Sequence, residues 1–132
     1  MQKICKENLN YITAAKFLSN YLKLSTVITL AGPVGSGKST LVAEVLRLFG
    51  VKYERSPTYT LINEYTLGNQ LQLWHVDMYR NFTTIVYYLT ESSAIKIIEW
   101  CPDTVASLLK PTFNVHVTQN HVYSIYGCNY DV

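Results

Sequence analysis

The chain has 132 residues and a formal net charge of +2, and 48% of its residues are hydrophobic whereas only 15% are charged. This length predicts a single domain, residues 1–132, with one core, and the apolar content excludes a disordered chain. The weak and scattered positive charge gives no indication of a nucleic-acid-binding surface. Because no apolar run is long enough to span a bilayer and the first residues lack the apolar core of a signal peptide, we expect a cytoplasmic protein without membrane association.

The first half of the chain predicts a helix, a strand, a loop and a second helix. Apolar residues recur at helical spacing over residues 10–24, so we expect a packing helix there. Residues 26–31 are β-branched and apolar, as in a buried strand, and residues 41–49 have helical composition. Gly50 follows this second helix and is suited to end it.

A glycine-rich loop between that strand and the second helix fits the pattern G-x-x-x-x-G-K-[ST], the P-loop that wraps nucleotide phosphates. Glycines let the loop turn back and bring backbone N–H groups to phosphate oxygens. We expect Lys38 to meet the β- and γ-phosphates and the Ser39 hydroxyl to meet Mg²⁺, with the helix N-terminus facing the same anion. An ordinary glycine-rich turn is the alternative. The predicted nucleotide-binding residues are Gly32, Pro33, Val34, Gly35, Ser36, Gly37, Lys38, Ser39 and Thr40.

The second half of the chain predicts two hairpins, a strand and a short helix. Residues 59–66 and 71–77 form the first hairpin, and residues 84–89 are compatible with either a helix or a strand. Residues 94–99 predict a strand, and residues 103–109 a helix that Pro102 begins and Pro111 ends. Residues 113–118 and 122–126 alternate and predict a closing hairpin at the sheet edge.

Two carboxylates, Asp77 and Glu99, end apolar strands. Because ligands gather at the carboxyl ends of parallel strands, both would face the P-loop if their strands run parallel to the first. One would then hold Mg²⁺ and the other would orient or deprotonate a water, although solvated surface carboxylates are the alternative. Thr58 carries a hydroxyl in a loop of the kind that follows the γ-phosphate in switch-type NTPases, and simple turn formation is the alternative there.

Several other polar and aromatic residues have a structural interpretation beside a functional one. Arg80 is suited either to reach phosphate or to form a structural ion pair. Trp100 is expected in the core, with the wall of the nucleotide pocket as the alternative, and His75 as a packed neutral imidazole. His116 and His121 have no partner that the sequence reveals. The widely separated Cys5, Cys101 and Cys128 predict free thiols rather than a disulfide framework or a zinc site.

Four blocks of the sequence resemble in order and spacing those of the TsaE (YjeE) family, the small bacterial ATPases of tRNA threonylcarbamoyladenosine synthesis. The resemblance covers residues from about 13 to 102, in the blocks Gly32–Thr40, Ser56–Tyr65, His75–Arg80 and Ile97–Trp100. It implies a compact α/β P-loop domain with helices flanking a central mixed sheet. It also implies ATP and Mg²⁺ as cofactors, TsaB-like and TsaD-like proteins as partners, and tRNA contacted indirectly through the complex.

The same resemblance implies roles for the site residues. Lys38 and Ser39 would take phosphate and Mg²⁺, and Thr58 would lie in a switch-like loop. Glu99 would be a metal ligand and Asp77 the water-orienting group or base, although the residues alone leave the division between the two carboxylates open. Pro33 departs from the Asp that many relatives carry at that position.

Three functional hypotheses follow from the sequence. A TsaE-like ATPase is motivated by the four ordered blocks and predicts slow hydrolysis that partners stimulate. A small-molecule or nucleoside kinase is motivated by the same P-loop, although the chain shows no arginine cluster for a lid. A nucleotide-gated binding module without useful catalysis is the third.

Overall fold

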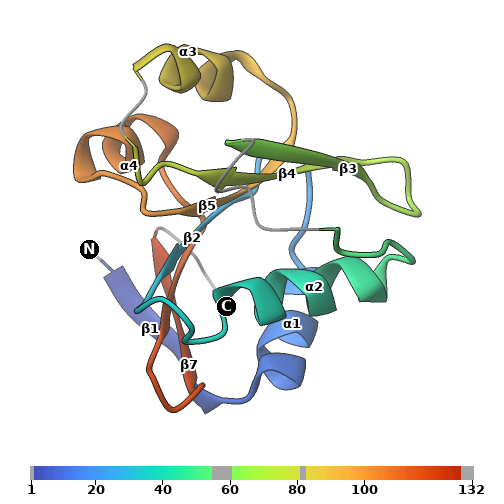
Figure 1. The fold of residues 1–132 in the computed structure, drawn as a ribbon, viewed down its shortest axis with the longest axis vertical. Helices are drawn as coiled ribbons and strands as arrows, with labels where there is room; N and C mark the ends of the chain where they lie inside the picture. Colours follow the sequence, from blue (N-terminus) through green and yellow to red (C-terminus); the bar gives the residue numbers. More distant parts are fainter. Residues whose placement is uncertain (1, 55–60, 81–82, 129–132) are drawn as a thin grey trace.

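One mixed β-sheet with helices on both faces makes up the computed structural model, which describes residues 2–54, 61–80 and 83–128 (Figure 1). This architecture confirms the predicted α/β class with a central mixed sheet and flanking helices. The strands are β1 (Gln2–Leu9), β2 (Val27–Ala31), β3 (Ile62–Thr66), β4 (Gln72–Asp77), β5 (Ile95–Glu99), β6 (Phe113–Val117) and β7 (Tyr123–Cys128). The helices are α1 (Tyr11–Ser19), α2 (Lys38–Leu48), α3 (Thr83–Glu91) and α4 (Asp103–Leu109).

The sheet has the strand order β1-β7-β6-β2-β5-β4-β3. Its four central strands, β6, β2, β5 and β4, run parallel, whereas β3, β7 and β1 pair antiparallel with their neighbours. Parallel strands place their carboxyl ends at one edge of the sheet, where ligands of open α/β sheets bind. The register pairs Glu99 with Leu30 on one side and with Asp77 on the other, so both carboxylates reach the edge that carries the P-loop.

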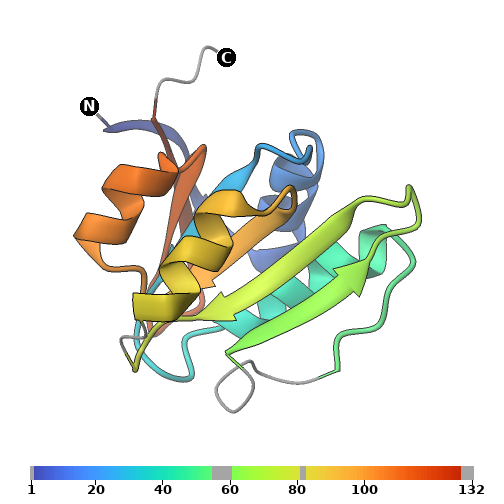
Figure 2. The same cartoon turned by 90° about the horizontal axis from the view of Figure 1, so that it is seen from above.

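Two apolar layers form because alternate residues of each buried strand point to opposite faces. Helices α1 and α2 cover one face and α3 and α4 the other, as both views show (Figures 1 and 2). Along β5, Ile97 packs with the α1–α2 layer and Ile98 with the α3–α4 layer. The run of apolar residues in β2 and β5 is thereby buried from both sides, as the sequence predicts for strands of a parallel sheet.

Most predicted elements are confirmed, with small changes of boundary. The segment that was compatible with helix or strand is the helix α3, and both hairpins form. Helix α1 ends at Ser19, five residues earlier than predicted, because the next residues form a turn. The Thr26 hydroxyl closes that turn, since it donates to the Tyr21 carbonyl at 2.7 Å and accepts from the Lys23 N–H at 3.0 Å.

The N-terminal strand was not predicted, and it changes the position of the closing hairpin. Strand β1 pairs antiparallel with β7, so the β6–β7 hairpin lies inside the sheet and its prediction as an edge is wrong. The sequence of β1 is mostly charged and polar, and its register shifts twice along β7, so its own side chains give little strand signal. Within the described ranges no helix combines the length and the apolar character that a membrane span requires.

Candidate functional site

The P-loop joins β2 to α2 and has the backbone shape that its glycines predict. Gly35 has φ of +80° and Gly37 has φ of +115°, values that residues with a Cβ rarely adopt. Gly37 is also the N-cap of α2 and supplies no side-chain cap, so the first N–H groups of the helix keep their hydrogen-bonding capacity for a ligand. The Ser36 hydroxyl oxygen is buried without a hydrogen-bond partner in the described structure.

Contacts from the β6–β7 hairpin hold this loop in place. The His121 ring donates from Nδ1 to the Ser36 carbonyl at 2.7 Å, and the Tyr123 hydroxyl donates to the Gly37 carbonyl at 2.7 Å. A Cβ on Gly32 would lie 2.5 Å from the Val117 carbonyl oxygen, so the loop also begins in close contact with β6. The hairpin therefore supports the P-loop where it begins, at Gly32, and just before α2, at Ser36 and Gly37.

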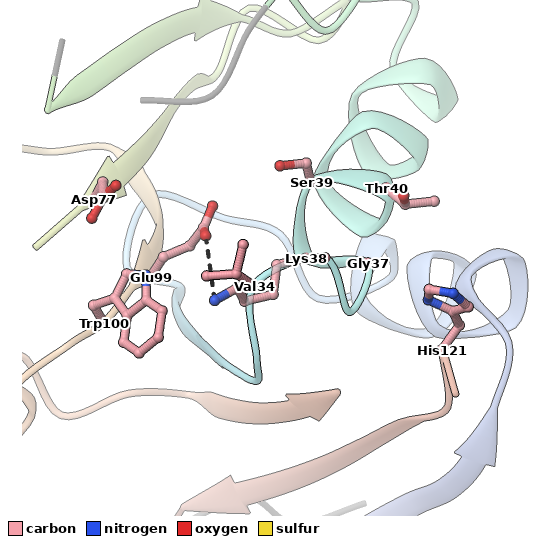
Figure 3. A pocket seen from close by; sticks show the side chains of 10 residues that line it. Val34, Gly37, Lys38, Ser39, Thr40, Asp77, Glu99, Trp100 and His121 are labelled. Carbon is pink, nitrogen blue, oxygen red and sulfur yellow. Dashed lines mark ion pairs between the residues drawn. The ribbon is translucent and has the colours of Figure 1, made fainter. Parts of the chain in front are cut away.

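The Lys38 side chain crosses the mouth of the loop and is only 7% exposed. Its ammonium donates to the Gly32 carbonyl at 2.8 Å, lies 3.9 Å from Glu99 Oε1 and sits 4.1 Å from the centre of the Trp100 ring. Figure 3 shows the ion pair between the P-loop lysine and the end of β5. A buried cation thus stands between a carbonyl, a carboxylate and an aromatic face.

The two carboxylates predicted to be catalytic differ in their partners. Asp77 accepts the Tyr79 N–H at 2.8 Å with Oδ1, a contact that fixes the turn after β4. Glu99 instead meets a side chain, because its Oε2 lies 2.5 Å from His75 Nε2. Both residues are only 7% exposed, and Glu99 is the one that the structure pairs with the buried ammonium of Lys38.

A cavity of about 310 Å³ opens between these groups (Figure 3). Of the predicted site residues, eight line it, whereas Gly32, Pro33 and Ser36 belong to the loop without lining the cavity. The predicted catalytic Thr58 lies outside the described residues. The lining residues are Val34, Gly35, Gly37, Lys38, Ser39, Thr40, Asp77, Glu99, Trp100 and His121.

Sequence reasoning missed part of this lining. Trp100 is 39% exposed with φ of +59°, so its expected place in the core is wrong and the alternative, a pocket wall, is right. Its ring packs edge-on against Tyr79 at 5.2 Å between centroids. His121, for which no partner was foreseen, lines the cavity beside Thr40, and no local pattern marks it because it comes from a hairpin turn distant in sequence.

Tyr53 is a further unpredicted neighbour of the site. Its hydroxyl oxygen is buried and has no hydrogen bond of good geometry within the described residues. Burial raises the pKa of Tyr53, the nearby Ser39 hydroxyl opposes the rise, and the negative charge of Glu99 adds to it. An orphaned hydroxyl therefore lies close to the side chains expected to meet Mg²⁺.

These observations fit a bound phosphate chain with a magnesium ion. The loop offers backbone N–H groups at a helix N-terminus and a buried ammonium, which together suit phosphate. Among the described residues no group of three or more His, Cys, Asp or Glu side chains is arranged to hold a metal alone. Mg²⁺ is usually held by one or two protein oxygens together with substrate phosphates and water, and Ser39 and Glu99 on this cavity carry such oxygens.

Comparison with known proteins decides the family. The family profile described as "Threonylcarbamoyl adenosine biosynthesis protein TsaE" matches residues 5–124, which is most of the chain. The chain belongs to the TsaE family. The TsaE protein of Rickettsia typhi is 31% identical to it over 113 residues, which cover 80% of this chain and 75% of the relative.

Other TsaE proteins match over shorter stretches. That of Synechocystis sp. is 44% identical over 73 residues, covering 54% of this chain and 46% of the relative. The chain spans about half the length of the first such relatives. The crystal structure of YdiB from Bacillus subtilis superposes with a TM-score of 0.66 at 23% identity, covering 96% of this chain and 86% of that one, and supports the fold alone.

Proposed function

We propose that this TsaE-family chain binds and hydrolyses MgATP, as the ATPase subunit that drives turnover of a TsaB–TsaD-type complex in tRNA threonylcarbamoyladenosine modification. The observation that carries the proposal is the convergence of Lys38, Ser39, Asp77 and Glu99 on one cavity of about 310 Å³ at the P-loop edge of the sheet. The relatives are tRNA threonylcarbamoyladenosine biosynthesis proteins by name, which supports the pathway. Contact with tRNA is assigned to the complex rather than to this chain.

Each residue has a chemical task in this proposal. The P-loop N–H groups bind phosphate oxygens, and Lys38 exchanges the Gly32 carbonyl for the β- and γ-phosphates. Ser39 and Glu99 are the residues that would hold Mg²⁺, which when bound neutralises charge on the phosphates. Asp77 keeps a carboxylate oxygen that the Tyr79 N–H does not engage, so it is suited to orient or deprotonate the attacking water.

The described arginines do not supply a further positive charge to this cavity. Arg47 forms a two-point ion pair with Glu44, at 2.9 Å and 2.7 Å, on α2, and Arg80 is exposed at the rim of a second cavity. An arginine at the γ-phosphate is worth several orders of magnitude in rate in related reactions. We therefore expect slow hydrolysis by the chain alone and faster hydrolysis when partners bind.

The test is ATP hydrolysis by the purified chain, alone and after addition of matched TsaB-like and TsaD-like proteins. Glu99→Ala removes the proposed metal ligand, and Glu64→Ala, an exposed carboxylate on β3, is the matched control. We expect a low rate that rises with partners, disappears in Glu99→Ala and persists in Glu64→Ala. Tight ATP binding without hydrolysis in the assembled complex would instead favour a nucleotide-gated binding module.

A second cavity supports the kinase hypothesis as an alternative function. It measures about 390 Å³, shares Val34, Asp77 and Trp100 with the first, and is otherwise lined by Leu61, Tyr79 and Arg80. Its apolar wall beside an arginine and a carboxylate is the kind of surface that accepts a small polar substrate. A screen of nucleosides and other small alcohols with labelled ATP tests this alternative, and transfer of label to any of them would displace the ATPase proposal.

A further inference from the structure

His75 is buried completely beneath the site, yet it contacts the carboxylate that the proposed function assigns to Mg²⁺. The ring has 0% exposure, and its Nε2 lies 2.5 Å from Glu99 Oε2. Its other nitrogen, Nδ1, is also buried and has no hydrogen-bond partner in the described structure. In proteins, buried N–H groups without an acceptor are rarer than buried acceptors with an unused lone pair. This difference indicates that the unpaired N–H group costs more free energy. The proton of the ring therefore sits on Nε2 and is donated to Glu99.

The strand register explains why these two side chains meet. β4 and β5 are parallel neighbours, and His75 pairs across them with Ile97, two residues before Glu99. Side chains two residues apart on a strand lie on the same face, so the Glu99 side chain leans back along β5 to reach the imidazole. The contact links the interior of the sheet to the cavity beside the P-loop.

Without this contact, the Glu99 side chain has a competing partner. Its free oxygen, Oε1, stands 3.9 Å from the Lys38 ammonium, a distance beyond that of a hydrogen bond. A flexible glutamate with opposite charge beside it would close on the lysine, because a direct ion pair in a buried site is strongly attractive. A direct Glu99–Lys38 ion pair would occupy the ammonium that the site needs for phosphate and the carboxylate that it needs for Mg²⁺.

We propose that His75 is a positioning residue, which holds Glu99 through Oε2 so that Oε1 stays available to Mg²⁺ or to a water bound to it. The proposal rests on the assignment of Glu99 as a Mg²⁺ ligand. Groups that orient a metal-binding side chain from behind commonly change metal affinity by ten- to a hundredfold when they are removed. His75 acts through Glu99 and touches neither nucleotide nor metal.

The experiment compares His75→Leu, which fills the space without a donor, with His75→Gln, whose amide N–H can reach the position of Nε2. The affinity for a fluorescent ATP analogue is measured in EDTA and across a Mg²⁺ titration, and a thermal melt checks that each variant folds. We expect His75→Leu to change the EDTA affinity by less than about twofold and to raise the half-saturating Mg²⁺ concentration about tenfold. His75→Gln should recover most of that loss. Should the leucine variant not fold, His75→Phe keeps the ring shape without a donor.

A second comparison separates positioning from simple packing. In a Glu99→Gln background, His75→Leu should produce no further change in Mg²⁺ dependence, because the group through which His75 acts is already altered. Equal Mg²⁺ dependence in His75→Leu and the unmodified chain would contradict the positioning role. Equal losses of affinity with and without Mg²⁺ would also contradict it, since they indicate packing.

The experiments can distinguish failure of the positioning role of His75 from failure of the proposed ATPase activity. Mg²⁺-linked nucleotide binding without hydrolysis, in the chain and in the assembled complex, would contradict the ATPase alone. Normal hydrolysis with unaltered Mg²⁺ dependence in His75→Leu would contradict the positioning role alone. Absence of any Mg²⁺-linked nucleotide binding by the unmodified chain would overturn both.

Discussion

Replacing Gly37 with alanine should destabilise the protein through two separable effects. The first is backbone strain, because φ is +115° at this position. The second is a collision, because an added Cβ would lie 2.5 Å from the Tyr123 hydroxyl oxygen. That hydroxyl cannot move aside cheaply, since Tyr123 is 1% exposed and its hydroxyl donates to the Gly37 carbonyl.

The magnitude follows from these two effects. A left-handed backbone at a residue with a Cβ costs about 1–2 kcal/mol. Displacing the Tyr123 hydroxyl from its acceptor leaves a buried polar group unsatisfied, which costs about 1–3 kcal/mol more. The free energy of unfolding should therefore fall by about 3 kcal/mol, which lowers the melting temperature of a domain of this size by roughly 10 °C.

Two further variants isolate the effects. Gly35→Ala is the control for strain, because its φ is +80° but nothing lies within 4 Å of the added Cβ, and it should cost only about 1–2 kcal/mol. Tyr123→Phe removes the colliding oxygen, and the nearest remaining atoms stand 3.5 Å from the new Cβ. In that background Gly37→Ala should cost no more than Gly35→Ala. Urea unfolding without nucleotide or Mg²⁺ measures the unmodified chain, the three single variants and the double variant, since a bound ligand would add its own stabilisation.

The coupling between positions 37 and 123 is the decisive quantity. We expect it to be about 1–2 kcal/mol in a double-mutant cycle, because the two groups are in direct contact. An equal cost of Gly37→Ala with tyrosine or phenylalanine at position 123 would refute the reasoning, and so would a Gly35→Ala variant as unstable as Gly37→Ala.

Three more predictions concern the surroundings of the cavity. The Lys38 ammonium lies 4.1 Å from the centre of the Trp100 ring, and nucleotide binding should draw it away and change the tryptophan fluorescence emission. The emission change should vanish in Trp100→Phe. If it persists in that variant, it comes from the buried Trp74 instead. Tyr53→Phe should leave the free energy of unfolding unchanged or raise it by about 1 kcal/mol, because the buried Tyr53 hydroxyl has no hydrogen-bond partner in the described structure. The same variant should bind Mg²⁺–nucleotide severalfold more weakly. Clear destabilisation in urea would show that the hydroxyl makes a structural hydrogen bond instead. Burial raises the pKa of the Cys101 thiol from 9.0 to about 11, so alkylation at pH 8, followed by peptide mass spectrometry, should be about a hundredfold slower than in the unfolded chain. Because the folded state holds this proton more tightly, the associated stability is complete below pH 9 and is lost as the pH rises from 9 to 11, by at most about 2 to 3 kcal/mol, and Cys101→Ser should remove that loss.

The sequence predicted the parts of the site that local patterns and a general rule control. The P-loop follows from its glycine spacing, the strand before it from its β-branched run, and the helix after it from its composition. Asp77 and Glu99 were placed together by the rule that parallel strands end at one edge, and the register of β4 with β5 brings them there. None of these steps needs knowledge of distant contacts.

Contacts between distant segments explain what the sequence did not predict. His75 meets Glu99 only because β4 and β5 pair in one register, and His121 meets Ser36 across 85 positions of sequence. Trp100 follows a buried strand, but its left-handed backbone turns the ring out to the cavity rather than into the core. Strand β1 owes its place to backbone pairing with β7, which its side chains do not reveal.

The support of the P-loop by the β6–β7 hairpin also bears on the thermodynamics of ligand capture. The Tyr123 hydroxyl donates to the Gly37 carbonyl, and Tyr123 is also paired with Leu9 of the neighbouring strand β1. The N-terminal strand therefore stabilises the hairpin, and the hairpin stabilises the P-loop. A loop held in its binding shape surrenders little conformational entropy when an anion arrives, and more of the interaction free energy remains as affinity. Substitutions in β1, remote from any phosphate, should therefore weaken nucleotide binding by loosening the loop and leave its chemistry untouched.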